Sequence, residues 1–177
     1  MSFRHVARGG RYLRVADPAW TDPLDGSYAA VRGGRWNPPG SFPVVYLNRD
    51  VETARANVRR RFVGQPFGID DVQPERRPLL VHAEVGEASY VDVITEDGCD
   101  AAGLPPSYPL RLDGTPVPHA ECRPIGQRAW DRDERGIACR SAALEAWPPG
   151  EELAWFQRGD ERLGAAASEP FERWYWR

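Results

Sequence analysis

The sequence of 177 residues is poor in the residue types that mark metal sites, disulfide frameworks and histidine-based catalysis. Its three cysteines, Cys99, Cys122 and Cys139, are far apart and form no Cys-x-x-Cys or Cys/His spacing, which argues against a zinc site or a disulfide framework. No serine or cysteine in a nucleophile-elbow context lies near His82 or His119, so a histidine-based triad has little support. We therefore expect free thiols and no bound metal.

Long apolar runs and an excess of basic charge are also lacking. No run approaches the roughly 20 residues of a membrane span, and the arginine-rich N-terminal segment has no apolar core, so it does not read as a signal peptide. A formal net charge of -3 disfavours a general nucleic-acid or membrane-surface binder. We expect a cytoplasmic protein that does not contact membranes, with nucleic acid disfavoured as a partner, and we interpret local arginine clusters as sites.

Glycine, proline and tryptophan, in contrast, are abundant, with 17, 17 and 7 residues. This composition predicts a loop-rich fold of short elements with few helices. The length favours one domain over residues 1–177 with a core of its own. We place that core at about residues 12–156, followed by an aromatic tail at 157–177, which either packs back on the body or contacts a partner.

The hydrophobic pattern predicts the elements in outline. We expect strands at residues 12–15, 44–47, 136–140 and 153–156, and two further strands at 78–85 and 89–93 joined by a turn at Gly86. Helices are expected at 51–62, 96–102 and 121–132. The proline-rich residues 103–118 are interpreted as a long surface connection that could act as a lid.

The helix at 51–62 carries one residue that does not suit its apolar side. Asp50 is a suitable N-cap, and the apolar stripe includes Ala54 and Val58. Asn57 lies beside Val58 and is expected to face inward or toward the edge of the stripe. A polar side chain in that place needs a hydrogen-bonding partner.

Residues 32–40, Arg-Gly-Gly-Arg-Trp-Asn-Pro-Pro-Gly, form the most informative segment of the chain. Glycine lets a backbone approach a ligand closely, and the guanidinium groups of Arg32 and Arg35 match phosphate or carboxylate oxygens. Trp36 is interpreted as a structural anchor. The alternative is a tight turn before a strand with both arginines solvated. Because the residues cluster in a loop, we favour an anion-binding site.

Together with its surroundings, this loop resembles the RES domain family. The resemblance rests on a first strand with Arg14, the Gly33-Gly34-Arg35-Trp36-Asn37 loop, the Val45-Tyr46-Leu47 strand, the helix at Ala54 and a late strand that ends at Ser141. It implies an α+β fold related to ADP-ribosyltransferases, with a split, mostly antiparallel sheet, a few short helices and long loops. It further implies an NAD-degrading toxin held by a cognate antitoxin.

The resemblance also implies roles for individual residues. Arg14 and Arg35 correspond to the arginines that grip the dinucleotide phosphates, with Arg32 as a third candidate. Tyr46 corresponds to an active-site tyrosine next to the nicotinamide ribose, and Ser141 to the family serine, which binds substrate or orients a neighbour. NAD is then the substrate, with no further cofactor. A cognate antitoxin and a second copy of the chain are the candidate protein partners.

The chain departs from the family pattern at Asn57, where the family carries a glutamate, and at Val15, where some relatives carry an aromatic residue. Cleavage between ribose and nicotinamide passes through a positively charged state, which a carboxylate stabilises and an amide does not. Glu52 and Glu145 are candidate replacements, although Glu52 is five residues from Asn57 and points elsewhere on the helix.

Three functions remain open on these residues. The first is cleavage of the nicotinamide–ribose bond of NAD with water or phosphate as acceptor, carried by Arg35, Tyr46, Asn57 and Ser141. The second is a catalytically silent nucleotide-binding or partner-binding module, and the third is ADP-ribosyl transfer to a macromolecule. Binding of another phosphorylated ligand or an RNA end is disfavoured by the acidic balance.

Overall fold

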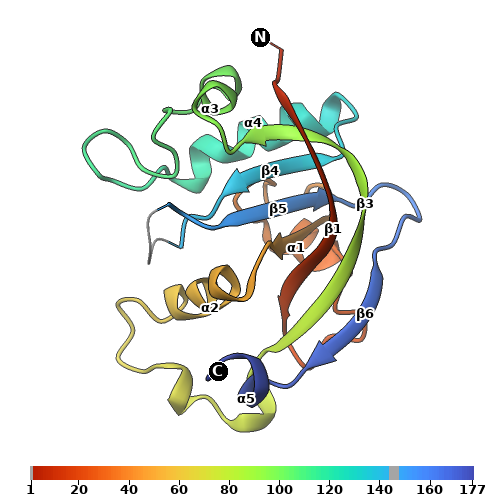
Figure 1. The fold of residues 1–177 in the computed structure, drawn as a ribbon, viewed down its shortest axis with the longest axis vertical. Coiled ribbons are helices and arrows are strands. Elements are labelled where there is room, and N and C mark those ends of the chain that lie inside the picture. The colour runs from red at the N-terminus through yellow and green to blue at the C-terminus, as the bar shows by residue number, and fades with distance from the viewer. Residues whose placement is uncertain (1, 144–147) are drawn as a thin grey trace.

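The computed structural model describes residues 2–143 and 148–177, which form a six-stranded sheet with short helices packed on it (Figure 1). The longest helix has 13 residues. In chain order the elements are β1 (His5–Ala16), α1 (Ser27–Arg32), β2 (Val44–Asn48), α2 (Val51–Arg60), the 3-10 turns η1 (Ile69–Asp71) and η2 (Pro74–Arg76), β3 (Leu79–Val93), α3 (Glu96–Ala102), α4 (His119–Asp131), β4 (Gly136–Arg140), β5 (Glu151–Phe156), β6 (Gly164–Glu169) and α5 (Phe171–Trp174).

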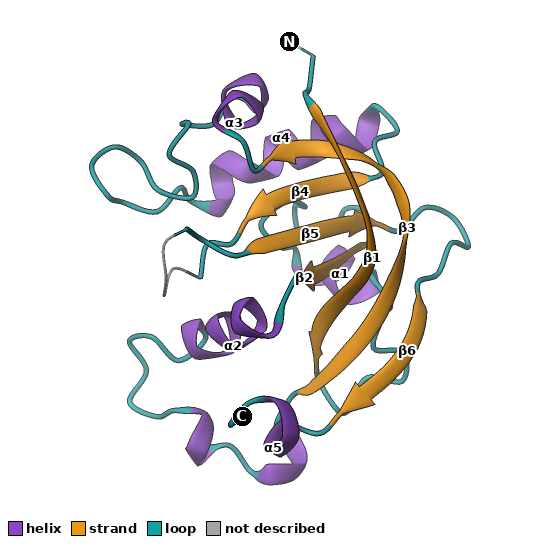
Figure 2. Cartoon of the chain, viewed as in Figure 1, coloured by secondary structure: helices purple, strands orange, loops and turns teal. Residues whose placement is uncertain are grey.

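Two long, curved strands, β1 and β3, run side by side along one side of the sheet (Figure 2). The strand order is β1-β2-β5-β4-β3-β6, and β1 also pairs with β3, so the first five strands of this order close into a ring with β6 outside it. Every pairing is antiparallel except that of β3 with β4. The predicted fold class, α+β with a split, mostly antiparallel sheet and short helices, is confirmed.

The two faces of the sheet are covered differently. On the helix-covered face, one core cluster includes Ile125 of α4, and another joins Leu13 of β1 to Ala54 of α2 and Phe171 of α5. The opposite face, which we call the inner face, is built from strand and loop residues such as Tyr12 and Leu153. Because side chains alternate along a strand, neighbours in sequence belong to opposite faces.

The prediction of two strands joined by a turn at Gly86 is wrong. β3 runs without interruption through this position and pairs with β1 along most of its length. The irregularity lies in the partner strand, where the register shifts between Arg8 and Gly10. Gly10 has a φ of 83°, and a Cβ on Gly9 would lie 2.7 Å from the Cα of Glu87. A bulge in β1 therefore accommodates the bend that the sequence suggested for β3.

The connection at residues 103–118 is also less superficial than predicted. Leu104, Tyr108 and Val117 are buried in the core cluster that contains Trp36. The ring centroids of Trp36 and Tyr108 are 5.9 Å apart. Trp36 itself is only 1% exposed, as its interpretation as a structural anchor requires.

The aromatic tail packs back on the body. Phe171 and Trp174 of α5 are buried with Leu13 and Ala54, and the Trp174 carbonyl accepts a hydrogen bond of 3.0 Å from Nε of Arg55 on α2. The indole nitrogen of Trp174 donates to the Pro78 carbonyl, 3.3 Å away. The C-terminal residues thereby hold α2 against the sheet. The sequence did not predict β6, which precedes them and consists mostly of small residues.

Candidate functional site

The loop at residues 33–40 has a backbone path that depends on its glycines. Gly33 ends α1 at a φ of 72°, and a Cβ there would lie 2.7 Å from the Pro39 nitrogen. A Cβ on Gly34 would lie 2.3 Å from the hydroxyl oxygen of Tyr46. The loop backbone thus lies directly against the Tyr46 ring, which only glycine permits.

Tyr46 on β2 fixes this loop with its hydroxyl group. The hydroxyl accepts a hydrogen bond from the Trp36 amide at 2.9 Å and donates one to Oδ1 of Asn37 at 2.8 Å. The fully buried Asn37 side chain in turn donates to the carbonyls of Ala29 and Phe42. Burial raises the pKa of Tyr46, and the negative charge of the nearby Glu152 acts in the same direction. The hydroxyl therefore remains a protonated donor.

Arg35 turns inward from the loop, toward the start of α4. It is 8% exposed, and its Nη1 donates to the Val117 carbonyl at 3.0 Å and contacts Sγ of Cys122 at 3.7 Å. Nε of Arg123, on α4, donates to the Gly34 carbonyl at 3.0 Å. The loop and the first turns of α4 are thus joined by two arginines.

Two further basic side chains lie close to these arginines. Partial burial lowers the pKa of His119, an otherwise exposed residue, to about 4, and the positive charges of three neighbouring arginines act in the same direction. These arginines are Arg35, Arg123 and Arg60. Partial burial also lowers the pKa of Arg60, likewise an exposed residue, as does the charge of Arg35. The loop, the end of α2 and the start of α4 thus concentrate positive charge at one place, which we call the arginine cluster.

A group of polar side chains lies beside α2, where β2 and β4 end and β5 begins. Asn48, at the end of β2, is opposite Glu152, near the start of β5. Oε1 of Glu152 accepts hydrogen bonds from Nδ2 of Asn57 at 2.7 Å and from Oγ of Ser141 at 2.5 Å. Nδ2 of Asn57 also donates to Oδ1 of Asn48 at 2.8 Å. We call these four residues the carboxylate cluster, because Glu152 connects its members.

The packing of the β4–β5 connection on α2 brings this cluster together. The Ser141 amide donates to the Gly150 carbonyl at 2.6 Å, and the Ala143 amide donates to Oγ of Ser141 at 3.1 Å. A Cβ on Gly150 would lie 1.9 Å from Oγ1 of Thr53, so glycine is needed where the connection crosses the helix. Ser141 itself is buried.

A surface cleft of about 400 Å³ opens beside Ser141. Its walls are one side of α2 and the described part of the β4–β5 connection, namely Asp50, Glu52, Thr53, Ala56, Arg59, Ser141, Ala143, Pro148 and Gly150.

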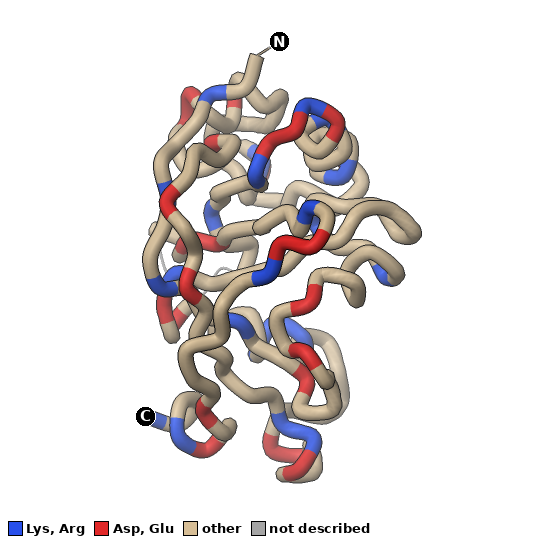
Figure 3. Tube along the Cα trace, turned by 90° about the vertical axis from the view of Figure 1, so that its right-hand side faces the viewer, with Lys and Arg blue, Asp and Glu red and all other residues tan. Residues whose placement is uncertain are grey.

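Basic and acidic residues are interspersed along the rest of the chain trace (Figure 3). The arginine cluster is therefore a local feature of the molecule.

The two clusters adjoin each other. Arg60 of the arginine cluster follows Asn57 of the carboxylate cluster by three residues on α2, which is about one helical turn, and the negative charge of Glu152 acts on the pKa of Arg60. Of the residues that the sequence marked, the structure accordingly brings together Arg35, Tyr46, Asn57 and Ser141. The partner that Asn57 was expected to need is supplied by Asn48 and Glu152.

Arg14 and Arg32 lie outside this arrangement. Arg14 alternates with Leu13 and so belongs to the inner face, where its guanidinium lies 5.0 Å from the Trp20 ring centroid and donates to the Asp25 carbonyl at 3.1 Å. Burial lowers the pKa of Arg14 to about 10. Arg32 is exposed in the last turn of α1.

Of the two carboxylates named as replacements for the family glutamate, the structure describes Glu52 alone. Glu52 is exposed and pairs with Arg55 along α2, with 2.5 Å between Oε1 and Nη1. Glu145 lies outside the described residues.

Sequence reasoning missed Glu152, Arg60, Arg123 and His119. The strand expected at residues 153–156 begins one residue after Glu152, whereas β5 begins at Glu151. Strand alternation would have placed Glu152 on the same face as Ala154, next to the late strand that ends at Ser141. The arginine cluster left no comparable signal, because its members come from three separate elements.

The structure also bears on membrane and metal binding. None of the helices among the described residues is long and apolar enough to cross a membrane. Within residues 2–143 and 148–177, no group of three or more His, Cys, Asp or Glu side chains is placed to hold a metal ion. Cys99, Cys122 and Cys139 are free and buried.

Two known proteins that carry the same name are similar to this chain in sequence. The NAD(+) phosphorylase MbcT of Mycobacterium bovis and its namesake of Mycobacterium tuberculosis are each 27% identical to this chain over 124 residues. The match covers 70% of this chain and 63% of each relative, so the chain spans less than two thirds of their length.

A solved structure and a family model extend the comparison to almost the whole chain. A chain in the crystal structure of the M. tuberculosis MbcT-MbcA toxin-antitoxin complex shares the fold, with a TM-score of 0.76 and 21% identity over 97% of this chain and 91% of that chain. The sequence model of the RES domain matches residues 7–176. The protein described here therefore belongs to the RES domain family.

Proposed function

We propose that this protein cleaves the bond between nicotinamide and ribose in NAD, with phosphate or water as the acceptor. The observation that carries the proposal is the meeting of the carboxylate cluster with the arginine cluster. One supplies a fixed negative charge and the other a concentration of guanidinium groups. NAD needs both, because its pyrophosphate is anionic and its reacting ribose becomes cationic. Membership of the RES family and the similarity to a named NAD(+) phosphorylase agree with this assignment.

In this mechanism the glycosidic bond breaks and its electron pair stays on the ring nitrogen of nicotinamide, which becomes neutral. Positive charge develops on the ribose, and an oxygen of phosphate or water forms the new bond to the ribose carbon. When water is the acceptor, a proton is released. The protein must orient the dinucleotide and stabilise the developing charge.

The residues have separate tasks in this proposal. Arg35, Arg60 and Arg123 provide the positive potential that holds the pyrophosphate or an acceptor phosphate. Tyr46 keeps the glycine-rich loop in place beside the nicotinamide ribose. Asn57 and Ser141 hold the carboxylate cluster together through their hydrogen bonds to Glu152. Arg14 and Arg32 are given no phosphate contact, because Arg14 lies on the inner face and Arg32 at the end of α1.

The test is the release of nicotinamide from NAD by the purified protein. Chromatography of reactions with and without phosphate separates ADP-ribose from its phosphorylated form and so identifies the acceptor. We expect Arg60→Gln to raise KM for NAD, since it removes a positive charge that lies close to Arg35. Arg11→Gln is the matched control, because the Arg11 side chain is exposed and its guanidinium pairs with Glu84, which belongs to neither cluster. Absence of nicotinamide at high enzyme concentration would reject the proposal.

A second candidate function is a silent nucleotide-binding module. It is favoured by Asn57, which has no charge at the position where the resemblance places a glutamate. Titration calorimetry with NAD and ADP-ribose identifies this case by binding without turnover. Product analysis with protein substrates tests transfer to a macromolecule.

We further propose that the protein acts as a toxin that is neutralised by an antitoxin. The proposal is supported by the shared fold with a chain of a toxin-antitoxin complex. Expression of this chain alone is expected to arrest growth, and co-expression of a protein encoded by an adjacent gene is expected to relieve the arrest. Normal growth with NAD levels unchanged would contradict the toxin role.

A further inference from the structure

The carboxylate cluster contains one charged residue, Glu152, at the centre of its hydrogen bonds. Both Asn57 and Ser141 donate to the same oxygen, Oε1, and no donor to Oε2 is found among the described residues. The Glu152 side chain is half-buried, and Oε2 is not among the fully buried side-chain atoms that lack a partner in the described part of the chain. One oxygen fixes the carboxylate while the other remains available to a ligand.

The hydrogen bonds that orient Glu152 are anchored in the sheet. Asn57 donates to Asn48 as well as to Glu152, and Nδ2 of Asn48 donates to the Leu13 carbonyl of β1 at 3.2 Å. Asn48 is 6% exposed and Ser141 1% exposed, so the supporting side chains have little freedom. This network sets the position of the carboxylate before any substrate binds, as electrostatic stabilisation requires.

We propose that Glu152 is the catalytic carboxylate of this protein, so that the negative charge comes from strand β5 and not from position 57 of helix α2. This inference rests on the proposed cleavage of NAD. In it, Asn57 has become the residue that positions Glu152 through its amide. The amide donates to the carboxylate, which a glutamate in the same place could not do without a proton.

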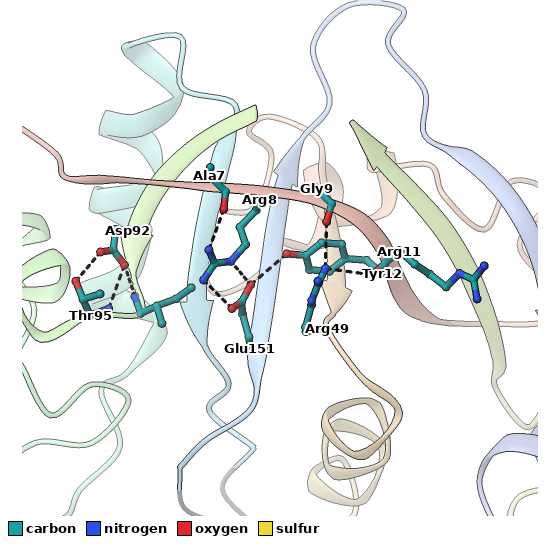
Figure 4. A network of polar contacts seen from close by, with 10 residues as sticks. Ala7, Arg8, Gly9, Arg11, Tyr12, Arg49, Asp92, Thr95 and Glu151 are labelled. Atoms are coloured by element: carbon teal, nitrogen blue, oxygen red, sulfur yellow. Dashed lines mark hydrogen bonds and ion pairs between the residues drawn. The ribbon is translucent and has the colours of Figure 1, made fainter. Parts of the chain in front are cut away.

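The adjacent acidic residue, Glu151, is excluded from this role by its contacts on the inner face. Nε and Nη2 of Arg8 bind its two oxygens at 2.7 and 3.0 Å, and the Tyr12 hydroxyl donates to Oε1 at 3.1 Å (Figure 4). Glu151 and Glu152 follow each other on β5 and therefore point to opposite faces. Glu151 therefore has a structural role through its ion pair, whereas Glu152 faces the proposed site.

Glu152 acts on the ribose as the glycosidic bond breaks. The bonding electron pair leaves with nicotinamide, and the carboxylate offsets the positive charge that this creates on the ribose while accepting a hydrogen bond from a ribose hydroxyl. The acceptor oxygen then bonds to the ribose carbon, and Glu152 is unchanged at the end of the cycle. No oxidant or further reactant is needed beyond NAD and phosphate or water.

The first test is Glu152→Gln. Glutamine keeps the size of the side chain and an oxygen that can accept from Asn57 and Ser141, so the substitution removes mainly the charge. We expect kcat for nicotinamide release to fall about 10²- to 10³-fold, as for the loss of other groups that stabilise a transition-state charge, with the Kd for NAD little changed. Glu84→Gln is the matched control, because Glu84 is exposed and pairs with Arg11, and neither residue contacts the carboxylate cluster through its side chain.

The second test returns the charge to helix α2. In the double variant Asn57→Glu/Glu152→Gln the amide and the carboxylate have exchanged places. Its kcat is therefore expected to be at least tenfold higher than that of Glu152→Gln alone. Asn57→Glu alone puts two carboxylates within hydrogen-bonding distance, and their repulsion is expected to lower activity below that of the wild type. A purely structural role for Glu152 predicts no such recovery.

The outcomes separate this inference from the proposed function. A wild type that binds NAD without releasing nicotinamide rejects both. A wild type that cleaves NAD, together with a folded Glu152→Gln variant of equal kcat, rejects the inference alone. If Asn57→Glu by itself increases the wild-type rate, the charge was missing from the site and the role given to Glu152 is wrong. Thermal unfolding and NAD titration of each variant distinguish loss of charge from loss of fold.

Discussion

At the scale of single residues, Tyr46 shows how much of the site depends on one buried hydroxyl. Tyr46→Phe leaves the Trp36 amide and Oδ1 of Asn37 without their partner. An unsatisfied buried polar group costs about 1–3 kcal/mol, so we expect a loss of this size in the free energy of unfolding measured in urea. Tyr28→Phe is the control and should have an effect below about 0.5 kcal/mol, since Tyr28 is 39% exposed. Equal losses in both variants would contradict the role of Tyr46.

His119 gives the protein a specific pH dependence. Its pKa is about 4 in the folded chain and near 6.5 when unfolded, so the unfolded chain binds more protons between these values. Stability is therefore expected to fall as the pH decreases from about 6.5 to about 4. His119→Asn should weaken this dependence in urea titrations at pH 7 and pH 5, and an unchanged slope would show that other groups cause it.

Binding of an anion should reverse this effect on His119. A phosphate among Arg35, Arg60 and Arg123 offsets the positive charges that help to lower the pKa of His119, so binding takes up a proton in this pH range. Calorimetry of NAD, whose pyrophosphate does not titrate near this pH, at pH 5.5 in buffers of different ionisation enthalpy is expected to detect this uptake. His119→Asn should remove it.

The residues that the sequence identified and those that it missed differ in a physical way. Asn57 was recognised because a polar side chain beside an apolar stripe needs a partner, which is a property of one helix. Glu152 can be identified as a site residue only from the hydrogen-bond network that it forms with Asn57, Asn48 and Ser141, which come from three other segments. A charge before a predicted strand has the same sequence pattern whether it faces solvent or a site.

At the scale of elements, the close approach of α4 to the glycine-rich loop sets the arginine cluster. A Cβ on Gly126 of α4 would lie 1.6 Å from the Trp36 carbonyl oxygen, so this helix can lie where it does only with glycine there. Gly126→Ala must displace α4 or the loop and is expected to cost about 1–3 kcal/mol in urea-induced unfolding and to raise KM for NAD. Gly164→Ala is the matched control, because nothing lies within 4 Å of the added Cβ. A stable Gly126→Ala variant with unchanged KM would contradict this coupling.

The elements themselves were predictable where local chemistry defines them. Asp50 caps α2 through the Thr53 amide at 2.8 Å, as its position before the apolar stripe suggested. β2 and β4 were recognised as short apolar runs, β4 with the bounds that the structure shows. The continuity of β3 was not predictable, because it depends on pairing with the bulged β1, a contact between segments distant in sequence.

At the scale of the whole molecule, the C-terminal aromatic residues join the two ends of the chain to the helix that bears Asn57. Trp174 is 3% exposed, packs with Leu13 and Ala54, and donates to the Pro78 carbonyl. Trp174→Ala leaves a large cavity and is expected to cost about 3–5 kcal/mol of unfolding free energy. Because Arg55 of α2 binds the Trp174 carbonyl, we also expect the variant to release nicotinamide more slowly at temperatures where it is still folded.

Trp176 provides the control for this prediction within the same segment. It is 53% exposed, and its substitution by alanine removes a ring of the same size from the same tail. We expect Trp176→Ala to unfold within about 1 kcal/mol of the wild type, since little apolar surface leaves the core. If both variants lost the same stability, the tail would act through the stacking of its own rings. A loss confined to Trp174→Ala means that the tail stabilises the protein by its contact with α2 and β1. The tail then helps to hold in place the helix that bears Asn57.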